Sequence, residues 1–163
     1  MRKNHKLIWT IVSMFVFFCI HVSLLSAENG SPVKIVENFA KAYFMLDNSM
    51  AEHLSKDALV NSQSVNMVDL YLEKKSMEAD NCGYKITFLQ KKATNMKIKV
   101  LNMGDSRATI EFDAITIRSL NPVYRVIGSV LGLVEKYKVH DIITVIKENG
   151  EWKIGPGAFE MPI

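Results

Sequence analysis

The spacing of apolar positions along the chain changes near residue 84. Before this point apolar residues recur every three or four positions, and after it they mostly recur at every second position. The first spacing is typical of amphipathic helices and the second of half-buried β-strands. The pattern therefore predicts an α+β protein in which N-terminal helices pack on a later antiparallel sheet.

Three helices are predicted in the first part. The first begins at Ser31-Pro32, a capping residue followed by proline at the first helical position, and ends near Asp47-Asn48. A short helix over 50–54 and a longer one over 64–79 follow. Asn81-Cys82-Gly83 is expected to end the last of them, because glycine after a helix readily adopts a left-handed conformation.

Five strands are predicted in the second part, over 84–88, 96–100, 107–118, 137–147 and 151–154. Asn149-Gly150 is a typical two-residue hairpin turn between the last two. Within 107–118 the apolar residues change parity after Ala114, which predicts a bulge or bend in that strand.

The stretch 122–134 has apolar residues at helical spacing, but Gly128 and Gly132 interrupt it. Each glycine disfavours a helix by about 1 kcal/mol relative to alanine. A helix, a loop and the start of a strand all remain open for this stretch.

The N-terminus combines a basic end over residues 2–6, an apolar run over 7–25 and Leu25-Ser26-Ala27 before Glu28. That order is typical of a secretory signal peptide. A run of this length also nearly spans a bilayer, so cleavage after Ala27 and retention as a membrane anchor both remain open. Both readings place a single domain over 28–163 outside the cytoplasm: exported to the periplasm or beyond, or anchored at the inner membrane.

The net charge of the chain, +3, comes from this leader. Of 20 Lys and Arg, three (Arg2, Lys3 and Lys6) precede Glu28, whereas all 17 Asp and Glu lie at or after it. The remaining 17 cations therefore balance 17 acids. A neutral domain lacks the basic field with which proteins neutralise nucleic-acid phosphates, so no nucleic-acid partner is expected.

The helices and the bent sheet, closed by a hairpin over Ile142–Ile146 and Trp152-Lys153-Ile154, resemble the NTF2-like superfamily, which includes SnoaL-like and ketosteroid-isomerase-like proteins. Val36–Tyr43 in the first helix also carries the likeness, which covers roughly 32–155. It implies a cystatin-like cone in which a curved antiparallel sheet wraps the first helix and leaves an apolar pocket.

Enzymes of that superfamily carry an acid or base after the second helix, where this chain has the neutral Asn61-Ser62-Gln63. Without a carboxylate to abstract a proton, their mechanism has no base. No cofactor is expected. No metal is expected either, because His53, His140 and Cys82 do not form a set of ligands in the sequence.

We therefore expect a non-catalytic domain that binds a small apolar ligand or a protein partner, with a homodimer through the sheet as one form of the latter. Candidate pocket residues are Phe39, Tyr43, Tyr71, Phe112, His140 and Trp152. Two alternatives remain open. One is a lyase or isomerase that uses Tyr43, His140 and Asp113. The other is a cell-envelope interaction module held at the membrane only through residues 7–25, with Val123 to Val134 as an additional apolar contact surface.

Overall fold

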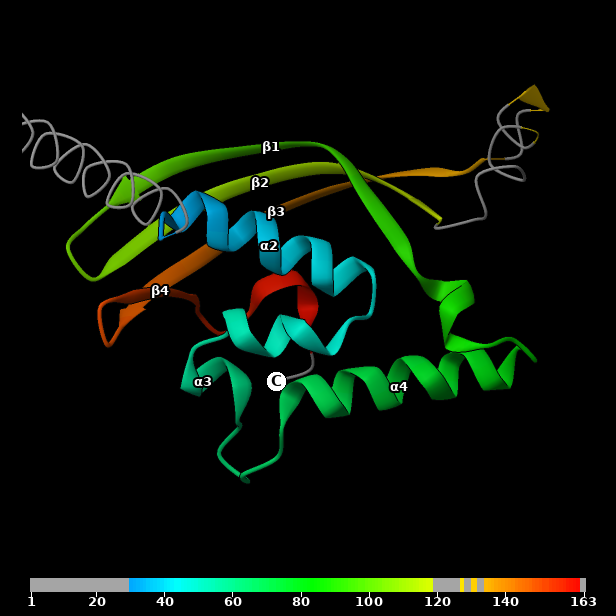
Figure 1. Cartoon of the computed structure of the whole chain (residues 1–163), viewed down its shortest axis with the longest axis horizontal. Helices are drawn as coiled ribbons and strands as arrows, with labels where there is room; N and C mark the ends of the chain where they lie inside the picture. Colours follow the sequence, from blue (N-terminus) through cyan, green and yellow to red (C-terminus); the bar gives the residue numbers. More distant parts are fainter. Residues whose placement is uncertain (1–29, 119–126, 128–129, 132–133, 162–163) are drawn as a thin grey trace, which may run out of the picture.

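The computed structural model describes residues 30–118, 127, 130–131 and 134–161, so the leader and most of 122–134 lie outside the described residues. The described chain is α+β, as expected: an open four-stranded antiparallel sheet in the order β1-β2-β3-β4, with helices against one face (Figure 1). The strands are β1 (Lys91–Met103), β2 (Arg107–Arg118), β3 (Lys136–Glu148) and β4 (Glu151–Ile154). The α-helices are α2 (Pro32–Phe44), α3 (Lys56–Leu59) and α4 (Met67–Asn81), and the 3₁₀-helices are η1 (Asn48–His53), η2 (Ile86–Leu89) and η3 (Ala158–Glu160).

Helix α2 lies against the inner face of the three long strands, which curve over it (Figure 1). Ser31 caps the helix as predicted, its side chain accepting a hydrogen bond from the Lys34 amide at 3.2 Å. The fully buried Phe39 belongs to one apolar cluster with Phe112 of β2 and Ile143 of β3. The helix thus supplies one half of the core and the sheet the other.

The other two predicted helices are found at the predicted places, but their boundaries or helix types differ from the prediction. Asn66 caps α4 by accepting from the amides of Val68 and Asp69, so the helix starts later than expected. It ends at Asn81, as predicted, and Gly83 takes a φ of 73°. The short second helix is the 3₁₀-helix η1, and α3 was not expected.

The segment 84–88 is not a strand. Its second half is the 3₁₀-helix η2, and the rings of Tyr84 and Phe88 stack with their centroids 4.3 Å apart. Residues four apart in a strand are separated by about 13 Å, so this contact requires a helical turn. The stacking of these two rings favours a helical turn, although the alternation of apolar and polar residues predicted a strand.

The bulge expected in 107–118 is absent from β2. The pairing of β2 with β3 runs without interruption, and Thr116 continues the buried parity of Phe112 and Ala114. The Thr116 hydroxyl lies 3.5 Å from the Tyr137 carbonyl oxygen, which satisfies its buried oxygen. The register shifts instead occur in β1, one of them between Thr94 and Lys97.

After β4 the chain returns beneath the sheet. Phe159 takes a left-handed conformation, with a φ of 51°, and its ring lies 4.9 Å from the ring of Phe112 and 5.7 Å from that of Phe39. The Phe159 amide donates to the Asp141 carboxylate at 2.8 Å. The Phe159 ring therefore packs against both α2 and β2 and joins the C-terminal segment to the core.

Candidate functional site

A cavity of about 550 Å³ lies where α4 and the end of α2 face the ends of β1, β2 and β3 near residues 91, 118 and 137. Its aromatic and apolar lining consists of Tyr43, Phe44, Leu46, Tyr71, Leu89, Val134 and Tyr137. Its charged lining consists of Lys75, Glu78, Lys91, Arg118 and Glu135. Aromatic and charged side chains share this lining, a combination that suits a small molecule with an apolar part and a polar part.

Two stacked tyrosines form the most buried part of this lining. The rings of Tyr43 and Tyr71 are nearly parallel, with their centroids 4.8 Å apart. The Tyr43 hydroxyl donates a hydrogen bond to the Phe159 carbonyl oxygen. Burial, reinforced by the Tyr43 hydroxyl, raises the pKa of Tyr71 far above its ordinary value, so Tyr71 stays protonated at neutral pH and offers no base.

Two cations occupy directly opposite positions on β1 and β2, where Lys91 pairs with Arg118. Both line the cavity, and each is held over an aromatic ring. The Lys91 Nζ lies 4.8 Å from the centre of the Tyr137 ring, and the Arg118 Cζ lies 4.3 Å from that of Phe88. Cation–π contacts of this kind orient a charged group without neutralising it.

The two carboxylates of the lining are already engaged. Glu78 forms an ion pair with Lys75 at 2.7 Å. Glu135 accepts a hydrogen bond from the Tyr137 hydroxyl. Three cations face two carboxylates in this lining, which leaves an excess of one positive charge.

The structure separates the six candidate pocket residues. Tyr43 and Tyr71 line the cavity. Phe39 and Phe112 are fully buried around Phe159. The other two lie elsewhere: Trp152 pairs with Lys147 at the far end of β3, and His140 is exposed on the outer face of the sheet.

The neutral loop 61–63, at the position where the resemblance places an acid, lines a different hollow, beside Gly157 and Met161. Sequence reasoning also missed Lys91, Arg118 and Tyr137. Their side chains meet only through the β1–β2–β3 register, for which the sequence carried no local signal.

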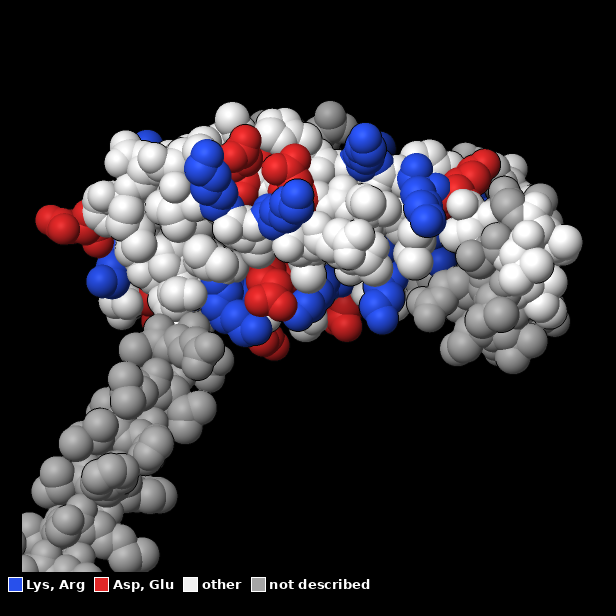
Figure 2. Space-filling view, turned by 90° about the horizontal axis from the view of Figure 1, so that it is seen from above, with Lys and Arg blue, Asp and Glu red and all other residues white. Residues whose placement is uncertain are grey.

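The outer face of the sheet carries mixed charges, and blue and red side chains stand next to one another near its middle (Figure 2). Lys97 pairs with Asp113 across β1 and β2, and Lys99 lies 3.9 Å from Glu111. Opposite charges at facing positions stabilise neighbouring strands modestly. Much of this face is therefore a ladder of cross-strand pairs.

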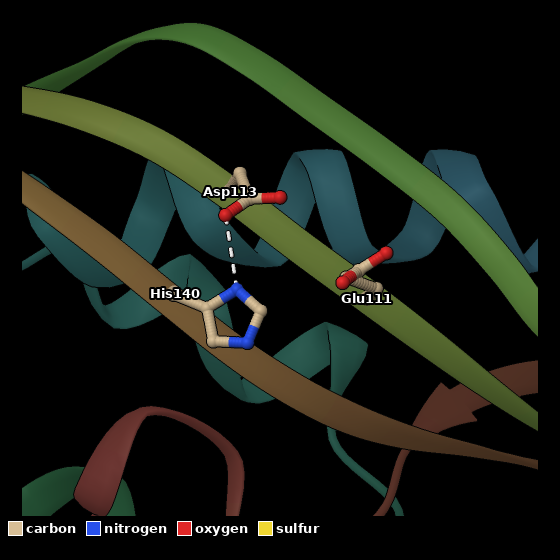
Figure 3. Close-up of side chains that lie close together, drawn as sticks. All are labelled: Glu111, Asp113 and His140. Carbon is tan, nitrogen blue, oxygen red and sulfur yellow. Dashed lines mark hydrogen bonds and ion pairs between the residues drawn. The ribbon is translucent and has the colours of Figure 1, made fainter.

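His140 extends the ladder to β3. Its Nδ1 lies 2.9 Å from the Asp113 carboxylate, and Glu111 stands beside them on the same face (Figure 3). Each of the three offers one ligand atom within 4.8 Å of the others, a spacing that a divalent cation could bridge. All three are at least partly exposed, and Lys99 already pairs with Glu111.

The catalytic set considered for a lyase or isomerase is not assembled. Tyr43 is buried on the helix side of the sheet, whereas His140 and Asp113 point away from that side (Figure 3). The sheet separates the phenol from the imidazole and the carboxylate. The three side chains do not share one concavity.

The Asp113 hydrogen bond has a measurable consequence for His140. It raises the pKa of His140 above 6.5. Because the shift is upward, the pair stabilises the fold fully below the unfolded-state pKa of His140 and loses this contribution as pH rises through the folded-state pKa.

We expect Asp113→Asn to lower the pKa of His140 in an NMR titration of the full chain. Glu111→Gln should have a smaller effect, and His53, whose pKa burial lowers, should not move. An unchanged His140 pKa in Asp113→Asn would contradict the hydrogen bond.

Comparison of the sequence with models of protein families and with curated proteins yields no match. Within the described residues, no helix combines the length and the apolar content required to cross a bilayer.

Proposed function

We propose that this chain is an exported, non-catalytic binding domain of NTF2-like architecture, which holds a small molecule with an apolar body in the cavity beside Tyr43 and Tyr71. The observation that carries the proposal is the cavity itself, a hollow of about 550 Å³ at one end of the sheet with both aromatic and charged walls. Pockets of this size and lining commonly take small organic ligands.

The chemistry of the lining supports binding without catalysis. A general base requires a group that is free to accept a proton near neutral pH. Glu78 is paired with Lys75, Glu135 accepts from the Tyr137 hydroxyl, and the raised pKa keeps Tyr71 protonated. These groups orient a ligand more readily than they take a proton from it.

The curved sheet over α2 and the closing hairpin of β3 and β4 support the NTF2-like architecture. In this chain, however, Phe159 occupies the space between α2 and the middle of the sheet. The ligand would therefore bind at the end of the sheet, next to α4. The basic end and the apolar run of the leader support export.

The test is a calorimetric titration of the full chain with decanol, a neutral probe with an apolar tail. We expect binding that Leu89→Trp weakens by about tenfold or more, because the indole fills part of the cavity, and a tenfold loss corresponds to about 1.4 kcal/mol. The matched control is Leu101→Trp, an exposed position on β1 away from the cavity. Both variants keep the apolar run over 7–25, so any binding there cancels in the comparison.

Equal affinity in Leu89→Trp and Leu101→Trp would place the decanol outside the cavity and contradict the proposal. The absence of any binding to the unaltered chain would contradict it as well.

A further inference from the structure

We infer that the ligand of this cavity is an amphipathic anion, whose carboxylate or similar acidic group is bound by Lys91 and Arg118 while its hydrocarbon part lies against the buried aromatic wall. This inference rests on the proposed function and adds the chemical class of the ligand. Its basis is the arrangement of charge around the cavity.

The pairing of Lys91 with Arg118 is unfavourable by itself. Like charges at directly opposite positions of neighbouring strands destabilise the pair, and none of the ion pairs among the described residues involves either side chain. On the outer face of the same strands, two lysines each have an acidic residue directly opposite: Lys97 faces Asp113 and Lys99 faces Glu111. The end of the sheet at the cavity lacks that compensation, and an anion between the two cations would supply it.

The two cations are also held in place before any ligand arrives. Lys91 lies over the Tyr137 ring and Arg118 over the Phe88 ring. A side chain that is already ordered loses less conformational entropy when it binds. Arginine in addition presents a planar fork of donors that matches a carboxylate.

Neither carboxylate of the lining forms an ion pair with Lys91 or Arg118 among the described residues. Glu78 is paired with Lys75, and Glu135 accepts from the Tyr137 hydroxyl. With the charges of both carboxylates counted against the three cations, the lining keeps one excess positive charge. A ligand with a single negative charge would balance it.

Exposure sets the orientation of the ligand. Arg118 is exposed and Lys91 half-buried, whereas Tyr43 and Tyr71 are buried. The acidic group would therefore lie toward solvent and the hydrocarbon toward the tyrosine rings. In this orientation the charged group remains partly hydrated, which limits the cost of desolvation.

The inference is tested with three probes that share a ten-carbon chain: decanoate, decanol and decyltrimethylammonium. Calorimetry on the full chain should show decanoate binding about tenfold more tightly than decanol, because only decanoate offers a charged group to the two cations; a tenfold change corresponds to about 1.4 kcal/mol. Decyltrimethylammonium should bind most weakly. Added salt should weaken decanoate binding but not decanol binding.

Lys91→Met and Arg118→Met remove one charge each while they keep an unbranched apolar stem. Each should reduce the preference for decanoate over decanol several-fold. Lys92→Met is the matched control, because Lys92 is the next residue on the same strand, is exposed, and pairs with Ile117 on the outer face.

Equal binding of decanoate and decanol, unaffected by Lys91→Met and Arg118→Met, would overturn the inference and leave the proposed function standing. Tightest binding of decyltrimethylammonium would also overturn it. Failure of all three probes to bind would instead contradict the proposed function.

Discussion

Replacing Phe159 by alanine is expected to lower the free energy of unfolding by about 3–5 kcal/mol, the range for truncating a buried aromatic residue in a core. The Phe159 ring contacts rings from α2 and from β2, with centroid distances of 5.1 Å to Tyr43 and 4.9 Å to Phe112. Its left-handed backbone costs about 1–2 kcal/mol in a residue other than glycine. The ring contacts must offset that cost, so their removal leaves both a void and the strain.

Urea denaturation of the full chain measures this loss. The control is Phe88→Ala, which truncates a half-buried ring that lies under Arg118 and outside the central cluster. We expect Phe88→Ala to cost less than half as much as Phe159→Ala. Comparable losses in the two variants would mean that the C-terminal segment does not fill the core.

Replacing Asp141 by alanine is expected to destabilise the protein by about 1–3 kcal/mol, because the partly buried Phe159 amide loses its charged acceptor. The Asp141 carboxylate accepts from the Phe159 amide and from the Ile142 amide, both at 2.8 Å. It therefore holds the C-terminal turn against β3. Asp141→Asn should cost less, because the amide oxygen still accepts one hydrogen bond although it lacks the charge.

The same denaturation measurement tests Asp141, with Asp105→Ala in the exposed β1–β2 turn as the control. A surface substitution of that kind should stay within about 0.5 kcal/mol. If Asp141 positions Phe159, Asp141→Ala should also cost much less in a chain that already carries Phe159→Ala. Additive losses in the double variant would contradict the coupling.

Local signals in the sequence predict much of this fold. Ser31-Pro32 marks the start of α2, Gly83 follows the end of α4, and Asn149-Gly150 forms the turn between β3 and β4. Each of these signals acts within a few residues, so the sequence alone is enough to read it. The alternating core positions of β2 are visible for the same reason.

Long-range pairing accounts for what the sequence could not predict. Lys91 and Arg118 meet only because β1 and β2 pair in one particular register, which includes shifts inside β1. Phe159 belongs to the core because the chain turns back after β4, a return held by Asp141. Periodicity also placed Phe112 on the inner face correctly but could not distinguish a cavity wall from a filled core.

The cavity beside Tyr71 is the centre of this account, and NMR chemical-shift mapping of the full chain with decanoate tests it most directly. The predicted result is a set of amide shifts at the cavity, around Tyr71, Leu89 and Tyr137, with little change at His140 on the outer face or at Trp152 at the far end of the sheet. Shifts centred on His140 or Trp152, or no shifts among the lining residues at saturating decanoate, would contradict it.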